Sequence, residues 1–326
     1  MEFIILLPMY NEEKQIPVTV QTLLTQESLK NRDYGLLLVD DGSSDNSWNV
    51  MTEQSTLYPD RVRALRLSRN FGKEAAICAG LDIADADAVI LMDGDLQHPP
   101  SSIPEMLRLW KEGYDIVEGV KSSRGDESFL SRMNAKFFYG LFRRTSGYDL
   151  ENASDYKLLD RQVVLHWRTL KEHSTFFRGL SQWLGFQRAT FSFEVAPRQH
   201  GKSRFSVRAL FRLSFNAITS FSAAPLHLIT FIGVLFFIGA VALAIQTLIH
   251  FFQGTAANGF TTVILMLLII GSCLMISLGL IGTYIARIFE EVKNRPRYIV
   301  SVDTDKLRES GSHRSGDTTR SPGETL

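Results

Sequence analysis

Charged residues are missing from a long internal stretch of the sequence. No Asp, Glu, Lys or Arg occurs between Arg212 and Arg287, although the chain carries 35 basic and 35 acidic side chains elsewhere. A globular domain is difficult to build over such a length without charge, whereas the hydrocarbon core of a lipid bilayer requires its absence. The missing charge therefore predicts a membrane protein.

Cysteine, a basic surplus and nucleotide-binding glycine loops are also scarce or missing. The two cysteines, Cys78 and Cys273, allow neither a disulfide framework nor a Cys-based zinc site. The formal net charge is zero, so nucleic acid is not an expected partner. No G-x-G-x-x-G follows a predicted strand and no G-x-x-x-x-G-K-[ST] occurs, which argues against dinucleotide oxidoreductases and P-loop NTPases. Residues 1–8 form an apolar strand pattern without a basic leader, so no signal peptide is expected.

Two apolar stretches lie inside the uncharged region, at about 226–252 and 261–286. Each is longer than the ~20 residues that a helix needs to cross ~30 Å of hydrocarbon, so a transmembrane hairpin is predicted. The alternative, a buried hairpin in a soluble protein, would need a larger surrounding domain than the chain provides. Residues 253–259 between the stretches carry no charge, and the positive-inside rule places the basic flanks in the cytosol. The flanking basic residues are Lys202, Arg204, Arg208 and Arg212 before the hairpin, and Arg287, Lys293, Arg295 and Arg297 after it.

Short β-rich runs alternate with helical patterns in the first part of the chain. Strands are predicted at 3–7, 36–39, 62–67, 88–92 and 115–119, and helices at 16–27, 46–54, 73–84 and 101–112. Strands that read as continuous apolar runs indicate a parallel sheet covered on both faces. In such sheets, ligands bind beyond the carboxyl ends of the strands.

Acidic residues follow two of these strands. Asp40 and Asp41 come after the second strand, and Asp93 and Asp95 after the fourth. Alone, the first pair is equally well explained as a turn with a helix cap at Ser44 or Asp45. Together they are more specific, because repelling carboxylates at one sheet edge favour a bound cation of the Mg²⁺ or Mn²⁺ type. Mg²⁺ completes its coordination with substrate phosphates, so a nucleotide diphosphate substrate is predicted.

Several short motifs resemble those of the family 2 polyisoprenyl-phosphate glycosyltransferases, over about residues 2–302. That family includes bactoprenol glucosyltransferases, dolichyl-phosphate mannose synthases and undecaprenyl-phosphate aminoarabinose transferases, and residues 218–222 look most like the bactoprenol glucosyltransferase branch. The motifs are Pro8-Met9-Tyr10-Asn11-Glu12, Val39-Asp40-Asp41-Gly42-Ser43, Asn70-Phe71-Gly72-Lys73, Asp93-Gly94-Asp95-Leu96-Gln97-His98-Pro99-Pro100, Gly282-Thr283-Tyr284-Ile285-Ala286-Arg287 and Arg295-Pro296-Arg297-Tyr298.

The resemblance implies an α/β GT-A fold, with a Rossmann-like, mostly parallel sheet, and a set of binding residues. The nucleotide sugar would be bound by Pro8, Tyr10, Glu12, Val39, Asp41, Asp93 and Gly94, with Asp41 recognising the base. The metal ligands would be Asp93, Asp95 and Gln97, and the cations for donor and lipid phosphates would be Lys121, Arg132, Arg198 and Arg204. The chain departs from the family at Lys202, where an acid is usual, and at Arg204, where a lysine is usual. At Lys121 the family often has Arg, so a bidentate fork is replaced by a point charge.

Asp155 matches the catalytic Asp of the family. Sequence alone leaves open that Asp155 caps the following helix, as Ser154 or Asp160 also could. A phosphate acceptor is already mostly ionised at neutral pH, so Asp155 would position the acceptor as much as deprotonate it.

The predicted organisation has four parts. Residues 1–200 form a cytosolic GT-A domain, 201–224 an amphipathic interfacial helix, 225–287 the two spans, and 288–326 a cytosolic segment that is disordered from about 304. The predicted activity is the inverting, metal-dependent transfer of a hexose, glucose in the first place, from a UDP-sugar to undecaprenyl phosphate in the bacterial plasma membrane. A flippase for the product and a homo-oligomer are possible partners. Alternatives are a transferase for another sugar nucleotide, of the GDP-mannose or UDP-aminoarabinose type, a processive glycan synthase, or an inactive membrane scaffold.

Overall fold

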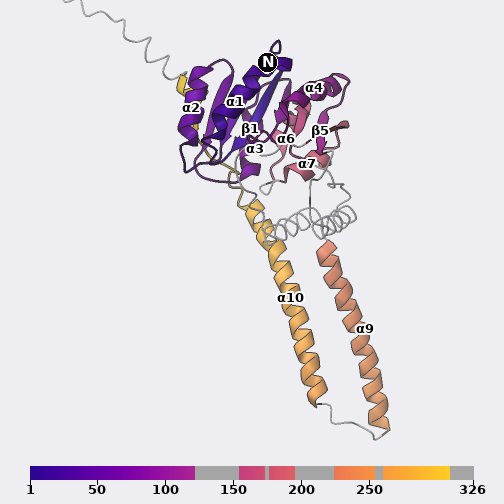
Figure 1. Cartoon of the computed structure of the whole chain (residues 1–326). Coiled ribbons are helices and arrows are strands. Elements are labelled where there is room, and N and C mark those ends of the chain that lie inside the picture. The colour runs from indigo at the N-terminus through magenta and orange to yellow at the C-terminus, as the bar shows by residue number, and fades with distance from the viewer. Residues whose placement is uncertain (122–153, 173–175, 195–223, 254–259, 309–326) are drawn as a thin grey trace, which may run out of the picture. The chain divides into compact units, whose positions relative to one another are not determined.

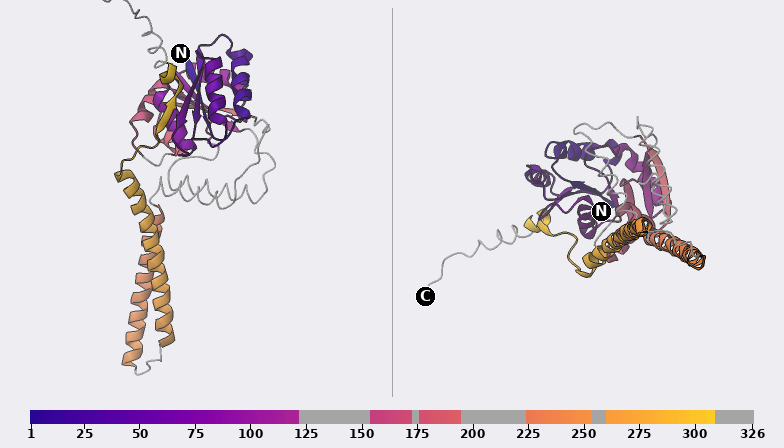
Figure 2. Two further views of the ribbon diagram at one scale, coloured as in Figure 1. Left: turned by 90° about the vertical axis from the view of Figure 1, so that its left-hand side faces the viewer. Right: turned by 90° about the horizontal axis from the view of Figure 1, so that it is seen from below.

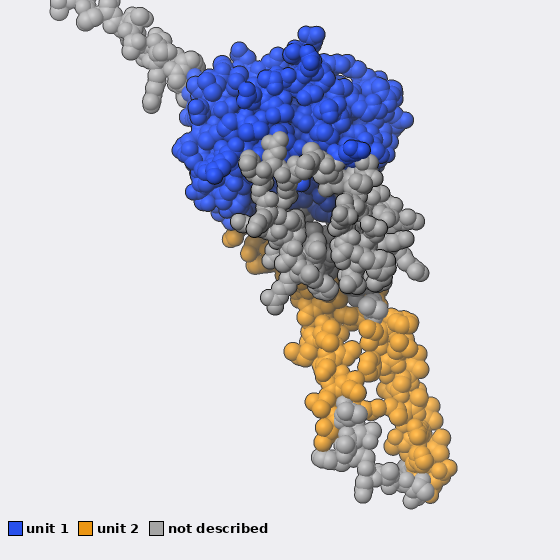
Figure 3. Space-filling model, in the orientation of Figure 1, with its two compact units in different colours: residues 1–140, 148–204, 296–326 blue, residues 141–147, 205–295 orange. Residues whose placement is uncertain are grey.

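The computed structural model describes residues 1–121, 154–172, 176–194, 224–253 and 260–308 (Figure 1). The chain divides into two compact units, and each is described by itself (Figure 3). Residues 1–140, 148–204 and 296–326 belong to the first unit, and residues 141–147 and 205–295 to the second.

The first unit is built on an eight-stranded mixed sheet. Its strands run in the order β7-β5-β6-β4-β1-β2-β3-β8. β1, β2, β3 and β4 pair in parallel, as do β5 and β7, whereas β6 and β8 pair antiparallel with their neighbours. The strands are β1 (Phe3–Met9), β2 (Tyr34–Asp40), β3 (Val62–Leu67), β4 (Ala88–Leu91), β5 (Ile116–Lys121), β6 (Lys157–Asp160), β7 (Arg188–Phe193) and β8 (Val300–Asp303).

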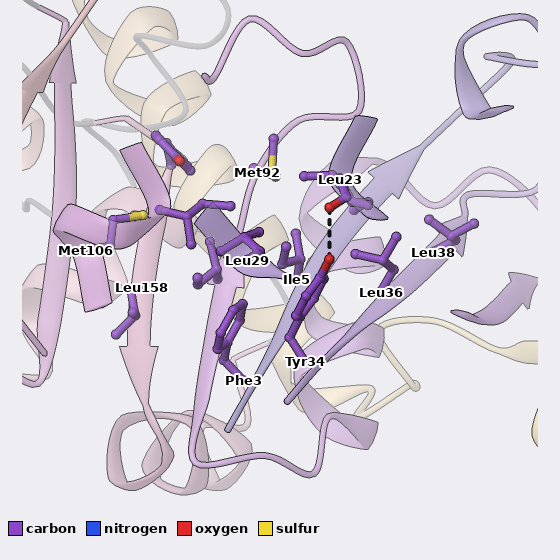
Figure 4. Close-up of a cluster of buried hydrophobic side chains, with 14 of the residues drawn as sticks. Phe3, Ile5, Leu23, Leu29, Tyr34, Leu36, Leu38, Met92, Met106 and Leu158 are labelled. Atoms are coloured by element: carbon purple, nitrogen blue, oxygen red, sulfur yellow. Dashed lines mark hydrogen bonds between the residues drawn. The ribbon is translucent and has the colours of Figure 1, made fainter. Parts of the chain in front are cut away.

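Helices cover both faces of this sheet, as the apolar strand runs predict. On one face, Phe3 and Ile5 of β1 belong to a buried cluster with residues of α1, α2 and α4, and Tyr34 donates a hydrogen bond to the Leu23 carbonyl at 2.9 Å (Figure 4). On the other face, α3 packs so closely on β1 that a Cβ at Gly80 would lie 2.1 Å from Leu6. The helices are α1 (Gln15–Thr25), η1 (Glu27–Leu29), α2 (Ser47–Leu57), α3 (Lys73–Ile83), η2 (Pro100–Ser102), α4 (Ile103–Lys111), α6 (Arg161–Thr169) and α7 (Phe177–Trp183).

The segment after residue 300 corrects one prediction. β8 pairs with β3 at the edge of the sheet (Figure 2), and residues 304–308 continue as a helical turn. Arg63 binds Asp303 at 2.7 Å, and Thr304 Oγ1 accepts a hydrogen bond from Ala64 N at 2.9 Å. Disorder from about residue 304 is therefore wrong for residues 304–308, because polar side chains that predict disorder here bind the edge strand. Residues 309–326 lie outside the described part.

The second unit contains two long apolar helices, α9 (Ala224–Phe252) and α10 (Phe260–Val292). Both are long and apolar enough to cross a membrane, over Ile229–Thr247 and Met266–Val292, and neither of these spans is buried within the protein. The fold prediction of an α/β domain followed by two apolar helices is confirmed. The predicted interfacial helix at 201–224 lies outside the described residues, apart from Ala224, where α9 begins.

Candidate active site

The loops after β1, β2 and β4 meet at one edge of the sheet, because these three parallel strands are neighbours. Asp41 N donates to the Met9 carbonyl at 3.0 Å, and Asn11 N donates to Ser43 Oγ at 2.9 Å, so backbone and side chains join the first two loops. The third loop joins them at Gly94, where a Cβ would lie 2.3 Å from Met9. The acidic residues found at separate strand ends in the sequence thus occupy one site.

The two acids at the end of β2, Asp40 and Asp41, have different roles. Asp40 is fully buried and accepts a hydrogen bond from Ser43 N at 2.9 Å, which is the turn role that sequence left open. Asp41 instead accepts hydrogen bonds from Phe71 N at 2.8 Å and Gly72 N at 2.9 Å. Burial raises the pKa of Asp41 above its ordinary value, although these two N–H groups lower it. Asp41 therefore fixes the loop that leads into α3.

The other predicted donor residues surround Asp41 with unequal exposure. Val39 is fully buried and pairs in register with Pro8, which is partly exposed. Tyr10 has 44% of its surface exposed, so its ring is available for stacking on a ligand. Glu12 is partly exposed, and its N–H donates to Ser47 Oγ at 2.8 Å. Val39 thus lies behind the accessible surface that Pro8 and Tyr10 offer.

The loop after β4 presents two carboxylates and an amide. Asp93, Asp95 and Gln97 are each partly exposed, and Asp95 Oδ1 accepts a hydrogen bond from Gln97 N at 3.1 Å. Within the described residues, no group of three or more His, Cys, Asp or Glu could hold a metal. Two carboxylates with a side-chain amide nevertheless fit Mg²⁺ or Mn²⁺, which complete their coordination with phosphate oxygens and water.

A lysine at the end of the motif Asn70-Phe71-Gly72-Lys73, to which the sequence analysis assigned no role, joins two carboxylates. Lys73, the first residue of α3, places Nζ 2.6 Å from Asp93 Oδ1 and 2.7 Å from Asp155 Oδ2. Burial works against its charged form, but Asp155 and Asp93 outweigh this and hold the pKa of Lys73 above its usual value. One cation therefore links the proposed metal loop to the candidate catalytic residue.

Asp155 is not a helix cap. Its carboxylate receives Arg178 Nε at 2.8 Å on Oδ1 and Nη2 at 3.2 Å on Oδ2, and only 9% of the residue is exposed. Burial by itself would raise the pKa of Asp155. The positive charges of Lys73 and Arg178 outweigh this effect and hold the pKa well below its usual range. The cap of α6 is Asp160, whose Oδ1 accepts from Gln162 N at 2.8 Å. Asp155 is therefore free of the structural role that sequence could not exclude.

Two further residues that sequence reasoning missed, Glu74 and His98, lie near Asp155 and Asp93. Glu74 accepts a hydrogen bond from Phe177 N at 2.8 Å, and burial together with Asp155 raises the pKa of Glu74 to about 7. His98 Nδ1 accepts a hydrogen bond from Asp93 N at 3.1 Å, and its ring stacks on Tyr156 at 4.8 Å. His98 lies in a motif that the sequence did mark, whereas Glu74 sits in an ordinary helical pattern that gives no signal.

Comparison with known proteins identifies the family. The model of "Glycosyl transferase family 2" matches residues 4–168, which include both acidic loops and Asp155. The chain belongs to glycosyl transferase family 2. It is therefore a glycosyltransferase, and its first unit has the GT-A fold.

Relatives in family 2 match nearly the whole chain. An uncharacterised glycosyltransferase of Bacillus subtilis, YkcC, is 36% identical over 301 residues, which are 92% of this chain and 93% of the relative. The SfII prophage-derived bactoprenol glucosyl transferase of Shigella flexneri is 35% identical over 305 residues, 92% of this chain and 97% of the relative. A crystal structure of glucosyl-3-phosphoglycerate synthase from Mycobacterium tuberculosis with Mn²⁺, UDP and glucosyl-3-phosphoglycerate aligns at 18% identity over 67% of this chain and 77% of that chain, with a TM-score of 0.46.

The phosphate-binding cations implied by family 2 are mostly outside the described residues. Arg132, Arg198 and Arg204 fall in the ranges 122–153 and 195–223, so the structure does not place them. Lys121 is described as the last residue of β5, where its backbone pairs with Phe193 of β7. Among the residues that are described, Lys73 and Arg178 supply the positive charge next to Asp155.

Proposed function

We propose that this glycosyltransferase transfers glucose from UDP-glucose to undecaprenyl phosphate at the cytosolic face of the bacterial plasma membrane. The observation that carries the proposal is the ionic bridge Asp93–Lys73–Asp155. Through it, Asp155, the residue expected to face the lipid phosphate, is tied to the loop expected to hold the donor diphosphate. The resemblance over nearly the full length to a bactoprenol glucosyl transferase supports the choice of sugar and lipid.

The donor side of the reaction would use the loops after β1, β2 and β4. Pro8, Tyr10 and Glu12 would contact the nucleoside, while Asp41 would recognise the base at the loop that it fixes. Asp93, Asp95 and Gln97 would hold Mg²⁺ or Mn²⁺ on the diphosphate. When bound, this ion would neutralise charge that develops on the departing UDP.

On the acceptor side, a phosphate oxygen of the lipid would attack C1 of glucose as the bond from C1 to the β-phosphate of UDP breaks. A single displacement of this kind inverts the anomeric carbon. The acceptor needs little help to lose its proton, because a phosphate monoester with a second pKa of ~6 is mostly ionised at neutral pH. Asp155, whose pKa is lowered by two cations, is a weak base, so we infer that it mainly orients the acceptor with Lys73 and Arg178. Lys121, Arg132, Arg198 and Arg204 would add positive charge for the phosphates.

Incubation of membranes with radiolabelled sugar nucleotides tests this proposal. Label from UDP-glucose is expected in the lipid fraction, and membranes that contain the Asp155→Asn variant serve as the matched control. Label from GDP-mannose or a UDP-aminoarabinose donor instead would replace the sugar assignment. Binding of UDP without any lipid labelling, over the whole donor panel, would favour the inactive scaffold.

The membrane orientation follows from the basic flanks of the two apolar helices. If α9 and α10 cross the bilayer with both flanks in the cytosol, a cysteine at Gln253 faces outward and one at Lys306 faces inward. A membrane-impermeant maleimide is then expected to label Gln253→Cys, and not Lys306→Cys, in intact cells. The wild-type chain is the control, since Cys78 is buried and Cys273 lies within α10. The opposite pattern would put the site in a compartment without cytosolic nucleotide sugars. A sugar-lipid product made in the cytosol would require a separate flippase to be used outside.

A further inference from the structure

An ion pair is buried on the strands behind Asp155. Glu118 of β5 and Lys157 of β6 face each other across the antiparallel pair, and they are 2% and 0% exposed. Lys157 Nζ lies 3.3 Å from Glu118 Oε1, and Arg188 of β7 places Nη2 2.5 Å from Glu118 Oε2. Removing charges from water costs several kcal/mol per ion, and a well-packed apolar replacement is often equally stable. Stability alone therefore does not explain this pair.

One hydrogen bond extends from the pair to the residue before Asp155. Glu118 Oε1 accepts from Ser154 N at 3.0 Å, and the Ser154 hydroxyl donates to the Gly119 carbonyl of β5. Ser154 is only 5% exposed, and these two bonds give its N–H and its hydroxyl partners inside the protein. Glu118 thus fixes the backbone from which the Asp155 side chain projects.

A second path extends from the pair to Arg178, the partner of Asp155. Lys157 Nζ donates to Ser181 Oγ at 2.6 Å, and Ser181 Oγ donates to the Arg178 carbonyl at 3.0 Å. The Lys157 ammonium also lies over the ring of Phe177, 5.5 Å from its centroid. Lys157 therefore holds α7 at the residue whose guanidinium binds Asp155.

We propose that Glu118 and Lys157 are positioning residues for the transfer reaction, which hold Asp155 and Arg178 in register with each other. The inference rests on the proposed function of Asp155. Neither residue reaches the accessible surface of the site, so both act through Ser154, Ser181 and the backbone. A displacement of reacting groups by ~1 Å from a distant change costs about 10²-fold in rate, which sets the scale of the expected effect.

The double variant Glu118→Gln/Lys157→Met removes the two fully buried charges together and leaves Arg188, whose side chain is 27% exposed, as the remaining charge of the three. The kcat for glucose transfer is expected to fall by about 10–100-fold, while the KM for UDP-glucose and the affinity for UDP stay within about twofold. The matched control, Arg63→Met/Asp303→Asn, removes a part-buried ion pair at the far edge of the sheet, between β3 and β8. It is expected to lower the Tm and leave kcat unchanged.

A double-mutant cycle separates positioning from loss of folded protein. In the Asp155→Asn background, the Glu118→Gln/Lys157→Met change is expected to reduce kcat by less than about twofold, because the residue that it positions is already altered. An equal fold loss in both backgrounds would overturn the inference. An unchanged kcat in the wild-type background would overturn it as well.

Hydrogen–deuterium exchange gives a readout that does not depend on the acceptor. The amides of residues 154–156 and 178–181 are expected to exchange faster in Glu118→Gln/Lys157→Met, while those of β1 keep their protection. If the wild-type enzyme transfers no sugar to lipid, the proposed function fails, and exchange still decides the inference: unchanged protection at 154–156 would overturn it.

Discussion

Asp155→Asn is expected to reduce glucose transfer by the ~10²–10⁴-fold that loss of a general base or positioning group causes. Asn keeps the size of the side chain but not its charge, so the bidentate bond from Arg178 and the contact with Lys73 both weaken. The affinity for UDP is expected to be preserved, because the ion pairs of Asp155 in the described part of the chain are with Lys73 and Arg178 rather than with the donor loops. The measurement is kcat with saturating UDP-glucose, together with UDP binding to the same preparation.

The pH profile and a control distinguish the possible roles of Asp155. Since Lys73 and Arg178 hold the pKa of Asp155 below its usual range, the stability that its charge contributes is present above the unfolded value of ~3.9 and is lost only as the pH falls below it. Between about pH 6 and 9, where Asp155 of the wild type stays ionised, a flat activity profile of Asp155→Asn indicates positioning, and recovery at high pH indicates proton removal. Asp160→Asn is the control, because Asn caps α6 about as well as Asp. Wild-type transfer by Asp155→Asn would sink the assignment.

Removal of the divalent cation is expected to abolish transfer. Asp95→Ala leaves Asp93 as the only carboxylate of the loop, and Asp93 already binds Lys73. An ion on the diphosphate contributes several kcal/mol to stabilising the leaving group, and each ~1.4 kcal/mol changes the rate tenfold. EDTA is expected to have the same effect on the wild-type enzyme, with recovery on addition of Mg²⁺ or Mn²⁺.

Mn²⁺ binding in the presence of UDP, followed by electron paramagnetic resonance, gives a second readout that is independent of turnover. Asp95→Ala is expected to lose this binding. Asp85→Ala is the matched control, because Asp85 is an exposed carboxylate that pairs with Arg161 away from the loop. Full transfer in EDTA would contradict the metal assignment, whatever the variant does.

Much of the fold of the first unit could be predicted, because its local signals agree. β3 occupies the predicted 62–67, and β1, β2 and β4 lie within about two residues of the prediction. Each is an apolar run that ends at polar or turn-forming residues. β6, β7 and β8 were missed, and each of them pairs with a strand far away in sequence. Strand pairing of this kind depends on tertiary context rather than local propensity.

The candidate site was predictable only at the level of residue types. Asp41, Asp93 and Asp95 stand within four residues of the ends of β2 and β4, so sequence places them at one edge. The partners of Asp155 come from α3 and α7, 82 and 23 residues away, and no local pattern predicts their direction. Capping by Asp155 and by Asp160 was equally plausible from sequence, and only the hydrogen bond to Gln162 N decides between them.

The late position of β8 in the chain has a consequence for biosynthesis. Asp303 lies 240 residues after Arg63, its partner on β3, and both apolar helices are synthesised between the two. Until β8 leaves the ribosome, β3 is an edge strand with unpaired backbone groups, which can pair with other chains. The sheet is therefore completed only on polypeptides that have already made α9 and α10, and insertion of those helices can begin before the catalytic unit is finished.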